Sequence, residues 1–174
     1  MLRAAGIPYT AIDSSIDQIE FSRRFGSKIY YGDPSNYDLL RAANVGAAQV
    51  FVIATDDAEA NIRTARLVRR IYPHLHVLAR ARNRQHAFRL MDLGVADPVR
   101  DTLHSSLRMT EQVLGALGVA SATIQQQLRT VEDPDDALLK SQHLVYDDET
   151  AIMQSAQVAA TDLEALFAAG QEQP

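Results

Sequence analysis

The sequence predicts an α/β fold, an open parallel sheet followed by an all-helical extension, on three observations. Short strand-like and helix-like segments alternate at regular spacing up to about residue 99, which is typical of parallel sheets with right-handed crossovers. The run from Val50 to Ala54 is continuously apolar, as expected of a strand buried on both faces. From residue 100 onward every segment has helical character. We therefore expect a sheet domain over residues 1–99 and a helical segment over residues 100–170.

The individual elements follow from apolar periodicity and from the residues that end helices. A first helical turn ends at Gly6, and a later helix is expected to end at Gly26, because glycine favours the conformation that stops a helix. Strands are expected at residues 7–13, 27–33, 47–57 and 74–81, and a short strand or a turn is expected at residues 93–99. Helices are expected at residues 14–26, 34–46, 57–71 and 83–92, and from residue 100 onward with breaks near Gly118 and at residues 132–136.

This order of elements predicts a Rossmann-like sheet that lacks its beginning. The first strand and the glycine-rich phosphate loop of such a fold are expected upstream of Met1, since the sequence starts near the end of a crossover helix. In the strand order 3-2-1-4-5-6 the missing strand is central, between the strands at 7–12 and 48–54. Three alternatives follow: these two neighbours pair directly, another chain donates a strand, or the product is poorly stable.

Composition restricts the classes of function. The chain of 174 residues carries a net charge of −5, which argues against nucleic-acid binding because that needs clustered excess Lys and Arg. It contains no cysteine, so disulfides, thiolate metal sites and cysteine nucleophiles are excluded, and a cytoplasmic protein is expected. The longest apolar runs are too short to cross a bilayer.

Small and acidic residues follow three of the predicted strands. They are Asp13 with Ser14, Gly32 with Asp33, and Thr55 with Asp56. In a dinucleotide fold an acid at the carboxyl end of the second strand accepts hydrogen bonds from ribose hydroxyls, and no arginine follows here to favour a 2′-phosphate. We expect an NAD-type or AMP-type ligand at this edge. The alternative is that the acids cap helices and form turns.

Three arginines at the end of the fourth strand suggest an anion site. Arg80, Arg82 and Arg84 precede His86 in an otherwise acidic protein, and guanidinium groups bind carboxylates in bidentate geometry. If the strand continued that far, all three would lie on one side of it. The alternative is a set of surface arginines that pair with Asp and Glu.

Catalytic motifs are absent from the sequence. The five histidines show no metal-ligand spacing beyond a weak His-x-His pair, and no phosphate loop or nucleophile motif occurs. A hydride-transfer enzyme would need a positioned acid or base, and the helical segment offers no obvious one. We therefore expect binding without catalysis and no metal site.

The first helix of the extension carries a stripe with the spacing of a helix–helix contact. It consists of Leu103, Leu107, Thr110, Leu114 and Leu117. The stripe either covers the edge of the sheet or forms a dimer seam.

Several segments together resemble a known family. They are AGIPYTAID, KIYYGDPSNYDLLRAA, VFVIATDD, YPHLHVLARARN, RLMDLGV and SLRMTEQVLGALG. In this order and spacing they are similar to the cytoplasmic regulatory domain of Kef-type potassium efflux antiporters, one of the RCK, KTN or TrkA N-terminal domains. The resemblance covers about residues 1–118.

The resemblance implies a nucleotide-binding domain at residues 1–99 and a dimerisation helix after it. Such domains dimerise, bind NAD(H) or AMP, and regulate a membrane transporter that exchanges potassium against protons, at the inner face of the cell membrane. In glutathione-gated members glutathione binds between protomers. By position, Asp13 matches the ribose-binding acid, Asp33 the acid near adenine, and Thr55 with Asp56 the third strand end, whereas Arg80 and Arg82 match the segment associated with glutathione. The alternatives are a fragment of an NAD-dependent oxidoreductase and a dimerising interaction module without a ligand.

Overall fold

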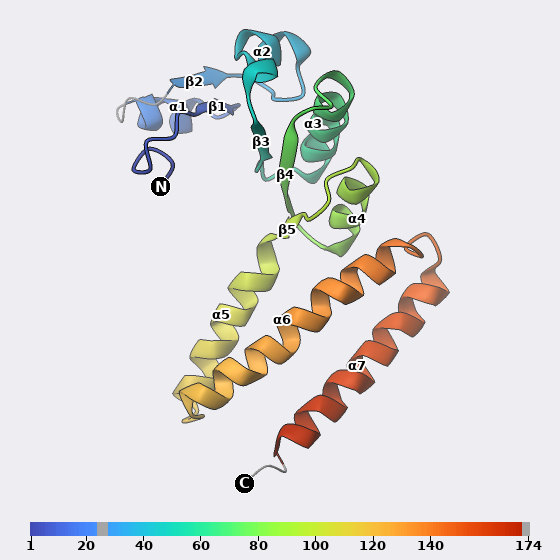
Figure 1. Ribbon diagram of the computed structural model, residues 1–174. Coiled ribbons are helices and arrows are strands. Elements are labelled where there is room, and N and C mark those ends of the chain that lie inside the picture. The colour runs from blue at the N-terminus through green and yellow to red at the C-terminus, as the bar shows by residue number, and fades with distance from the viewer. Residues whose placement is uncertain (24–27, 172–174) are drawn as a thin grey trace. The chain divides into compact units, whose positions relative to one another are not determined.

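The computed structural model describes residues 1–23 and 28–171, and the chain divides into two compact units. The sheet unit comprises Met1–Arg80 and Arg89–Val99, and the helical unit comprises Ala81–Phe88 and Arg100–Pro174. Figure 1 shows the elements in chain order. Residues 81–88 thus cluster with the helical unit, although they lie within the stretch expected to form the sheet domain. The helix stop expected at Gly26 lies outside the described residues.

All strand pairs with a recorded register are parallel, as expected. Strand β1 (Thr10–Asp13) pairs with β2 (Lys28–Tyr31), and β3 (Val50–Ile53) pairs with β4 (His76–Ala81). The short strand β5 (Val99–Arg100) completes the order β3-β4-β5. Strands that follow one another in the chain are therefore paired within each sheet, as in a Rossmann-like fold.

The two sheets are not joined to one another in the described part of the chain. Strand β1 pairs with β2, β3 pairs with β4, and no pairing of β1 with β3 is recorded. Direct closure of the sheet, one of the three alternatives expected from the sequence, is therefore not what this structure shows. Strands β1 and β3 each have one edge without a recorded strand neighbour among the described residues, and the backbone groups at such an edge can bond to water or to a further strand.

Among the described residues, four helices and a short 3-10 turn connect the strands of the two sheets. They are α1 (Ile16–Arg23), α2 (Tyr37–Ala42), the turn η1 (Val45–Ala47), α3 (Ala58–Ile71) and α4 (Arg84–Asp92). The side chain of Asn36 caps α2 by accepting from the N–H groups of Asp38 and Leu39. Between α2 and η1 the chain turns at Asn44, which has a φ of 58°, a conformation that asparagine tolerates better than most residues.

Helix α3 covers one face of the β3-β4 sheet. Buried Ile53 and Val77 belong to that face, and Ala65 of α3 is buried with them. On the opposite face Val50 and Val52 are 47% and 62% exposed. The expectation that β3 is buried on both faces is therefore wrong: side chains alternate along a strand, and the described helix packed on this sheet shields one side only.

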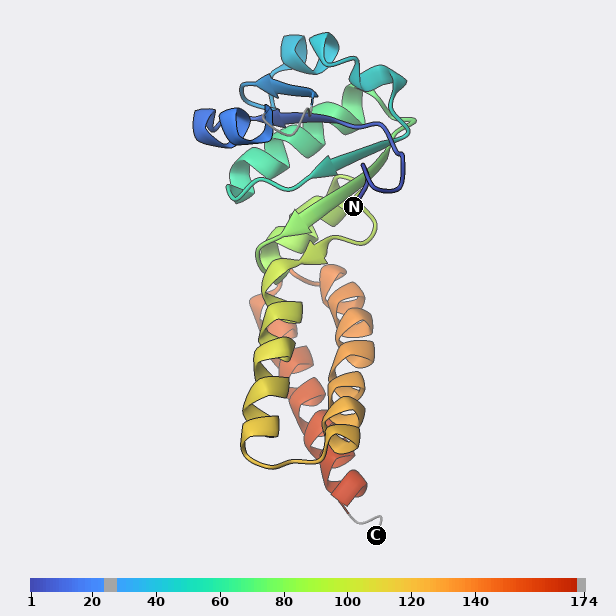
Figure 2. The ribbon, with the colours of Figure 1, turned by 90° about the vertical axis from the view of Figure 1, so that its left-hand side faces the viewer.

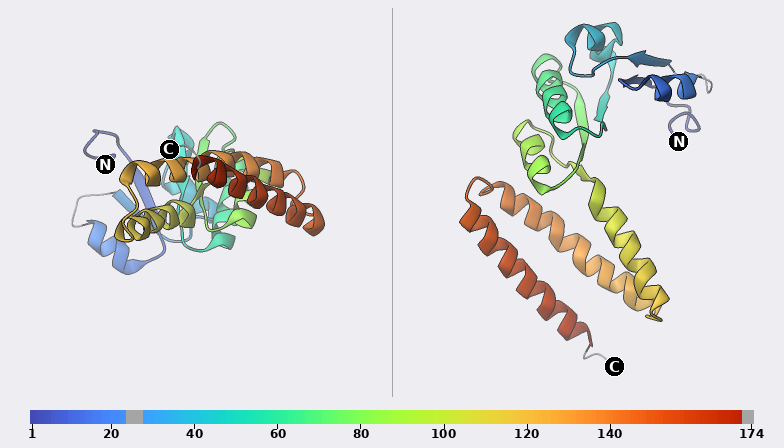
Figure 3. Two further views of the ribbon diagram at one scale, coloured as in Figure 1. Left: turned by 90° about the horizontal axis from the view of Figure 1, so that it is seen from below. Right: turned by 180° about the vertical axis from the view of Figure 1, so that it is seen from behind.

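The helical unit contains three long helices, α5 (Asp101–Ala116), α6 (Ser121–His143) and α7 (Glu149–Gln171). Helix α6 packs against both α5 and α7, and the three run side by side in Figure 2 and, from behind, in Figure 3. The chain leaves α5 through Gly118, whose φ is +84°, as expected from the sequence.

Helix α6 continues through residues 132–136, where a break was expected from the sequence. The continuity of α6 across the proline in this segment has a simple physical basis. A proline inside a helix removes one backbone hydrogen bond, and α6 has 23 residues whose other turns and packing against two helices keep it continuous.

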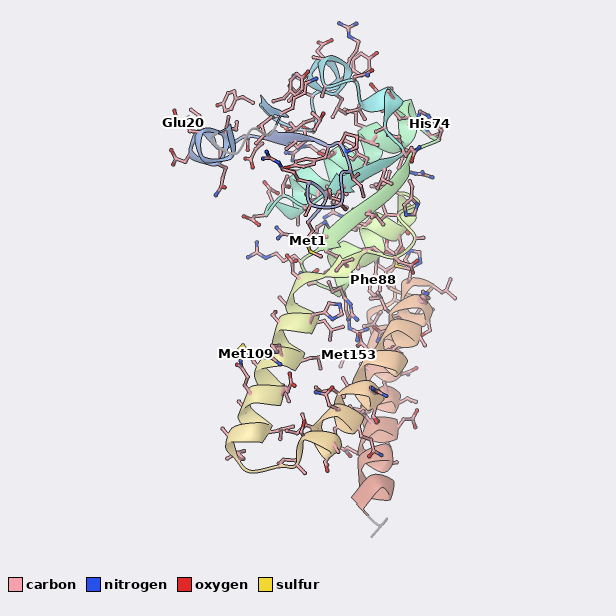
Figure 4. The ribbon with its side chains drawn as sticks, turned by 60° about the vertical axis from the view of Figure 1, so that its left-hand side comes forward. Met1, Glu20, His74, Phe88, Met109 and Met153 are labelled. Carbon is pink, nitrogen blue, oxygen red and sulfur yellow. The ribbon has the colours of Figure 1, made fainter. Side chains whose placement is uncertain are left out.

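The core of the helical unit is formed by apolar and aromatic side chains from several elements. Phe88 of α4, labelled in Figure 4, is buried and lies 6.1 Å from the ring of His143 and 5.3 Å from that of Tyr146. Ile124 and Leu139 of α6 are also buried. The first half of α4 is therefore held by the end of α6 and the turn that follows it.

The apolar residues of α5 divide into two faces. Leu103, Leu107 and Leu114 are half-buried, which is consistent with a position on the side of α5 that packs against α6. Met109 (labelled in Figure 4), Val113 and Leu117 are 66%, 56% and 75% exposed. The exposed stripe, which we call the α5 outer face, shares only Leu117 with the stripe expected as a dimer seam; of the other expected members, Thr110 is exposed and the three leucines are half-buried. No described helix is long and apolar enough to cross a membrane.

Candidate functional site

The carboxyl ends of β1 and β2 are joined by a backbone hydrogen bond. The N–H of Gly32 donates to the carbonyl oxygen of Asp13 over 2.9 Å. The Oδ1 atom of Asp13 accepts from the N–H of Ser15 at 2.8 Å, and Ser14 between them is exposed. Asp13 therefore forms the turn that the sequence allowed as an alternative. A carboxylate has about four acceptor positions, so this turn leaves capacity for a ribose hydroxyl.

Gly32 is required by its conformation and by its neighbour. Its φ is +143°, and a Cβ atom at this position would lie 2.9 Å from Cδ2 of Leu39. A larger residue would require the Leu39 side chain to shift and would strain the backbone at this positive φ.

Asp33 is held in its ionised form. Its Oδ1 atom accepts from the N–H of Ser35 at 2.8 Å. The hydrogen bonds from the backbone and the side chain of Ser35, and the positive charge of Arg63 on α3, lower the pKa of the Asp33 carboxyl below its usual range. Arg63 belongs to the helix that follows β3, and its charge makes the smallest of these contributions to the pKa of Asp33.

The two acids after β3 have different roles. The Oδ1 atom of Asp57 caps α3 by accepting from the N–H groups of Glu59 and Ala60 at 2.8 and 3.1 Å. Asp56 instead forms an ion pair with Arg80 of β4. The capping alternative is thus fulfilled by Asp57, and Asp56 remains at the strand end with an exposed carboxylate.

Asn61 links the ends of β3 and β4. It is 2% exposed, its Oδ1 accepts from the hydroxyl of Thr55, and its Nδ2 donates to the Thr55 carbonyl at 3.0 Å. Nδ2 also lies 3.5 Å from the Arg80 carbonyl oxygen. Sequence reasoning assigned Asn61 no role; an asparagine one turn into a helix after an acidic strand end is the signal that could have identified it.

The three arginines do not lie along one strand. Strand β4 ends at Ala81, so Arg80 lies in the strand, whereas Arg84 begins α4. Arg82 is exposed, and its N–H donates to Nδ1 of His86 at 3.1 Å. The expected common side, which required a longer strand, does not form.

Arg84 instead takes part in a polar cluster of the helical unit. It forms an ion pair with Asp135, which also pairs with Arg100. These contacts join residues 51 and 35 positions apart in the chain, and no local motif in the sequence announces them. Sequence reasoning therefore missed Arg100 and Asp135.

The described residues include no group of three or more His, Asp or Glu arranged to hold a metal ion. The strand ends thus offer carboxylates, a hydroxyl and a glycine turn. Such groups can hydrogen-bond a ribose and accommodate a base at the edge of a parallel sheet. Fold and site together define a Rossmann-like ligand-binding domain with a helical extension.

Comparison with known proteins identifies the family. The profile of the TrkA-N domain matches residues 1–100, and that of the potassium efflux system KefB C-terminal domain matches residues 105–174. The chain belongs to the TrkA-N domain family and, within it, to the Kef-type RCK domains. The second match extends beyond residue 118, where the resemblance seen in the sequence ended.

Individual relatives agree with this assignment. The glutathione-regulated potassium-efflux system protein KefC of Salmonella arizonae is 40% identical over 119 residues, which are 68% of this chain and 19% of that protein. The Kef CTD of Shewanella denitrificans, solved in an AMP-bound form, is 31% identical with a TM-score of 0.75 over 83% of this chain and 88% of that one. The TrkA-N domain of the inner membrane protein ybaL from Escherichia coli, 19% identical with a TM-score of 0.59 over 64% of this chain and 82% of that one, supports the fold.

Proposed function

We propose that this chain is the nucleotide-binding regulatory domain of a monovalent cation:proton antiporter and that it controls potassium efflux. The proposal is supported by the family and by KefC, of which the chain spans 19%. The transporter is the partner, in the same polypeptide or in another one, and the domain lies at the cytoplasmic face of the membrane. The domain senses a ligand and has no catalytic activity.

The proposed ligand is AMP or NAD(H), bound at the strand ends. The observation that carries this proposal is the ordered pair of acids at the ends of β1 and β2, where Gly32 bonds to Asp13 and Asp33 is kept ionised. Asp13 with Ser14 would accept from the ribose hydroxyls. Gly32, Asp33, Thr55 and Asp56 would line the base and ribose. The Shewanella denitrificans domain of the same family was solved with AMP.

Regulation requires that the ligand bind two states of the domain with different affinity. The domain is expected to act as a homodimer, in which the nucleotide biases the arrangement of the protomers and thereby the transporter. Arg80 and Arg82 would offer an anion site to glutathione, whose two carboxylates suit guanidinium groups. No nucleic acid is involved.

Binding of AMP, NADH and ATP to the full-length gene product tests the nucleotide site. We expect Asp13→Asn to weaken AMP or NADH binding by about tenfold, since a hydrogen bond to a charged acceptor is worth about 1.5–3 kcal/mol. Isothermal titration calorimetry measures the affinity. Asp17→Asn in α1 removes the same charge four positions away from the strand end and should leave affinity unchanged.

The outcomes separate the alternatives. Absence of nucleotide binding by the full-length protein, together with dimer formation, would overturn the proposal in favour of an interaction module without a ligand. Turnover of a small carbonyl or hydroxy compound with NAD(H) would instead support an oxidoreductase. Equal loss of affinity in Asp17→Asn would show that overall charge, and not the strand-end acid, determines binding.

A further inference from the structure

A side-chain amide joins the ends of β3 and β4 beyond the point where their recorded backbone pairing stops. The register of the two strands ends at the pair Ile53 and Ala79. Past this pair, Nδ2 of Asn61 donates to the carbonyl oxygen of Thr55 at 3.0 Å and lies 3.5 Å from that of Arg80. Asn61 therefore supplies at the strand ends the donor that a backbone N–H supplies along the strands.

The stability of α3 does not explain why an asparagine occupies this position. Asn61 lies on the buried side of the helix, where Ile62, Ala65 and Val68 are apolar. Asparagine is a weaker helix former than alanine or leucine, and a buried amide is costly unless it is hydrogen-bonded. Because Asn61 is only 2% exposed, its contacts with the strand ends are what stabilises the amide there.

The orientation of the Asn61 amide follows from its surroundings. Nδ2 faces the two carbonyl oxygens, and Oδ1 accepts from the hydroxyl of Thr55. The reverse orientation would place the amide oxygen, which cannot donate, against two other acceptors. The two carbonyl groups therefore direct Oδ1, and not Nδ2, toward the Thr55 hydroxyl.

This orientation determines the direction of the Thr55 hydroxyl. A hydroxyl has one hydrogen to donate and two lone pairs that accept. Both polar atoms recorded near it in the described part of the chain are acceptors, namely Oδ1 of Asn61 and the carbonyl oxygen of Asp57 at 3.5 Å. The hydrogen points at these atoms, and the oxygen of the half-buried side chain keeps its lone pairs for another partner.

From these contacts we infer that Asn61 is a positioning residue of the strand-end site and makes the Thr55 hydroxyl an obligate hydrogen-bond acceptor. The inference rests on the proposed nucleotide-binding function and adds a selection rule to it. A hydroxyl that can only accept bonds to a hydroxyl or an amine of the ligand and disfavours a phosphate oxygen. The carboxylates of Asp13, Asp33 and Asp56 are also acceptors, so the strand ends together select the donor groups of a nucleoside.

A double-mutant cycle tests whether Asn61 acts through Thr55. Calorimetry of AMP binding to the full-length gene product compares the native protein with Asn61→Leu, Thr55→Val and the double variant. Each single variant should weaken AMP binding by about tenfold, because a polar group of the site loses its partner. The double variant should bind about as weakly as Asn61→Leu alone, since both changes remove the same contact. A loss equal to the product of the two single losses would overturn the inference.

A comparison of ligands tests the selection of a donor and needs no change at Asn61. Three analogues each lack one donor group of AMP: the 2′-hydroxyl, the 3′-hydroxyl, or the amine that IMP replaces by a carbonyl. At least one of them should bind the native protein about tenfold more weakly than AMP, and Thr55→Val should abolish that difference. Thr55→Ser keeps the hydroxyl and should retain it. Three affinity ratios that are unchanged in Thr55→Val would contradict the inference.

Thr64→Val is the matched control variant. Thr64 is a buried residue of α3 whose hydroxyl has no hydrogen-bond partner among the described residues. The same threonine-to-valine change made there leaves the strand ends untouched. It should alter neither the affinity for AMP nor the ratios between the analogues.

Hydrogen–deuterium exchange of the full-length protein separates the inference from the function on which it rests. Peptides that contain Thr55 or Arg80 should exchange about fivefold faster or more in Asn61→Leu than in the native protein or Thr64→Val, because the strand ends open more often. Faster exchange without any nucleotide binding would overturn the proposed function and leave Asn61 as the residue that positions the strand ends. Nucleotide binding with unchanged exchange would overturn the inference and leave the proposed function intact.

Discussion

The turn around Asp33 favours the ionised form of a single carboxylate. Its pKa is lowered by the hydrogen bonds from Ser35 and by the charge of Arg63. A carboxyl whose pKa is lower in the folded state stabilises the fold above its unfolded pKa, about 3.9. This contribution is lost as the pH falls through the lower folded pKa.

We therefore predict that Asp33→Asn lowers the free energy of unfolding at pH 7 and that the difference disappears in acid. The loss should be below about 1 kcal/mol, because the side chain is exposed and solvent screens its interactions, and because the Asn oxygen can still accept from Ser35. Urea unfolding at pH 7 and at a series of lower pH values, continued until the Asp33 carboxyl is protonated in the folded state, measures it. A difference that does not shrink along this series would contradict the assignment to charge.

The stability of helix α3 depends on the residue that caps its N-terminus. Asp57 satisfies two N–H groups that the helix itself leaves without partners. The helix carries its buried face, with Ile62, Ala65 and Val68, against the sheet. The cap therefore anchors the segment that also positions Thr55 and Asn61.

We predict that Asp57→Ala destabilises the protein by about 1 kcal/mol, the usual value of an N-cap side chain. Asp57→Asn should cost only a few tenths of that amount, since asparagine caps helices about as well as aspartate. Chemical denaturation of the two variants measures the difference. Equal destabilisation by both would show that the charge of Asp57, and not its capping oxygen, matters.

The elements were largely predictable from the sequence, because apolar periodicity and glycine or proline signals are local. The position of Asp13, Asp33 and Asp56 at strand ends followed from the same local reasoning. Local patterns could not reveal that Val50 and Val52 face outward, since burial depends on which face a distant helix covers. The bridge from Asp135 to Arg84 and Arg100 could not be foreseen either, because it joins three separate elements of the chain.

At the scale of the whole molecule, the α5 outer face has a place in the proposed homodimer. Met109, Val113 and Leu117 follow one another at four-residue spacing on one side of α5, and all are exposed. An exposed apolar stripe on a helix is the usual site of association with another helix. We expect the second copy of the chain to pack there.

We predict that Val113→Glu weakens dimerisation at least about tenfold, since burying an unpaired carboxylate costs more than about 1.4 kcal/mol. Analytical ultracentrifugation measures the dissociation constant. Val158→Glu on α7 is the matched control, because Val158 is similarly exposed, and it should leave association unchanged. If Val158→Glu alone abolished the dimer, the interface would lie on α7 and not on α5.

The two contacts of Arg84 with α6 have a further consequence. Asp135 and Gln142 are seven residues apart, which is two turns and about 10 Å along a helix, and one guanidinium touches both. Rotation of α6 about its axis, or a slip by one residue, would move both partners out of reach together. Arg84 thus contributes to the helical phase of α6, and a rearrangement of the helical unit that turns this helix would break both contacts.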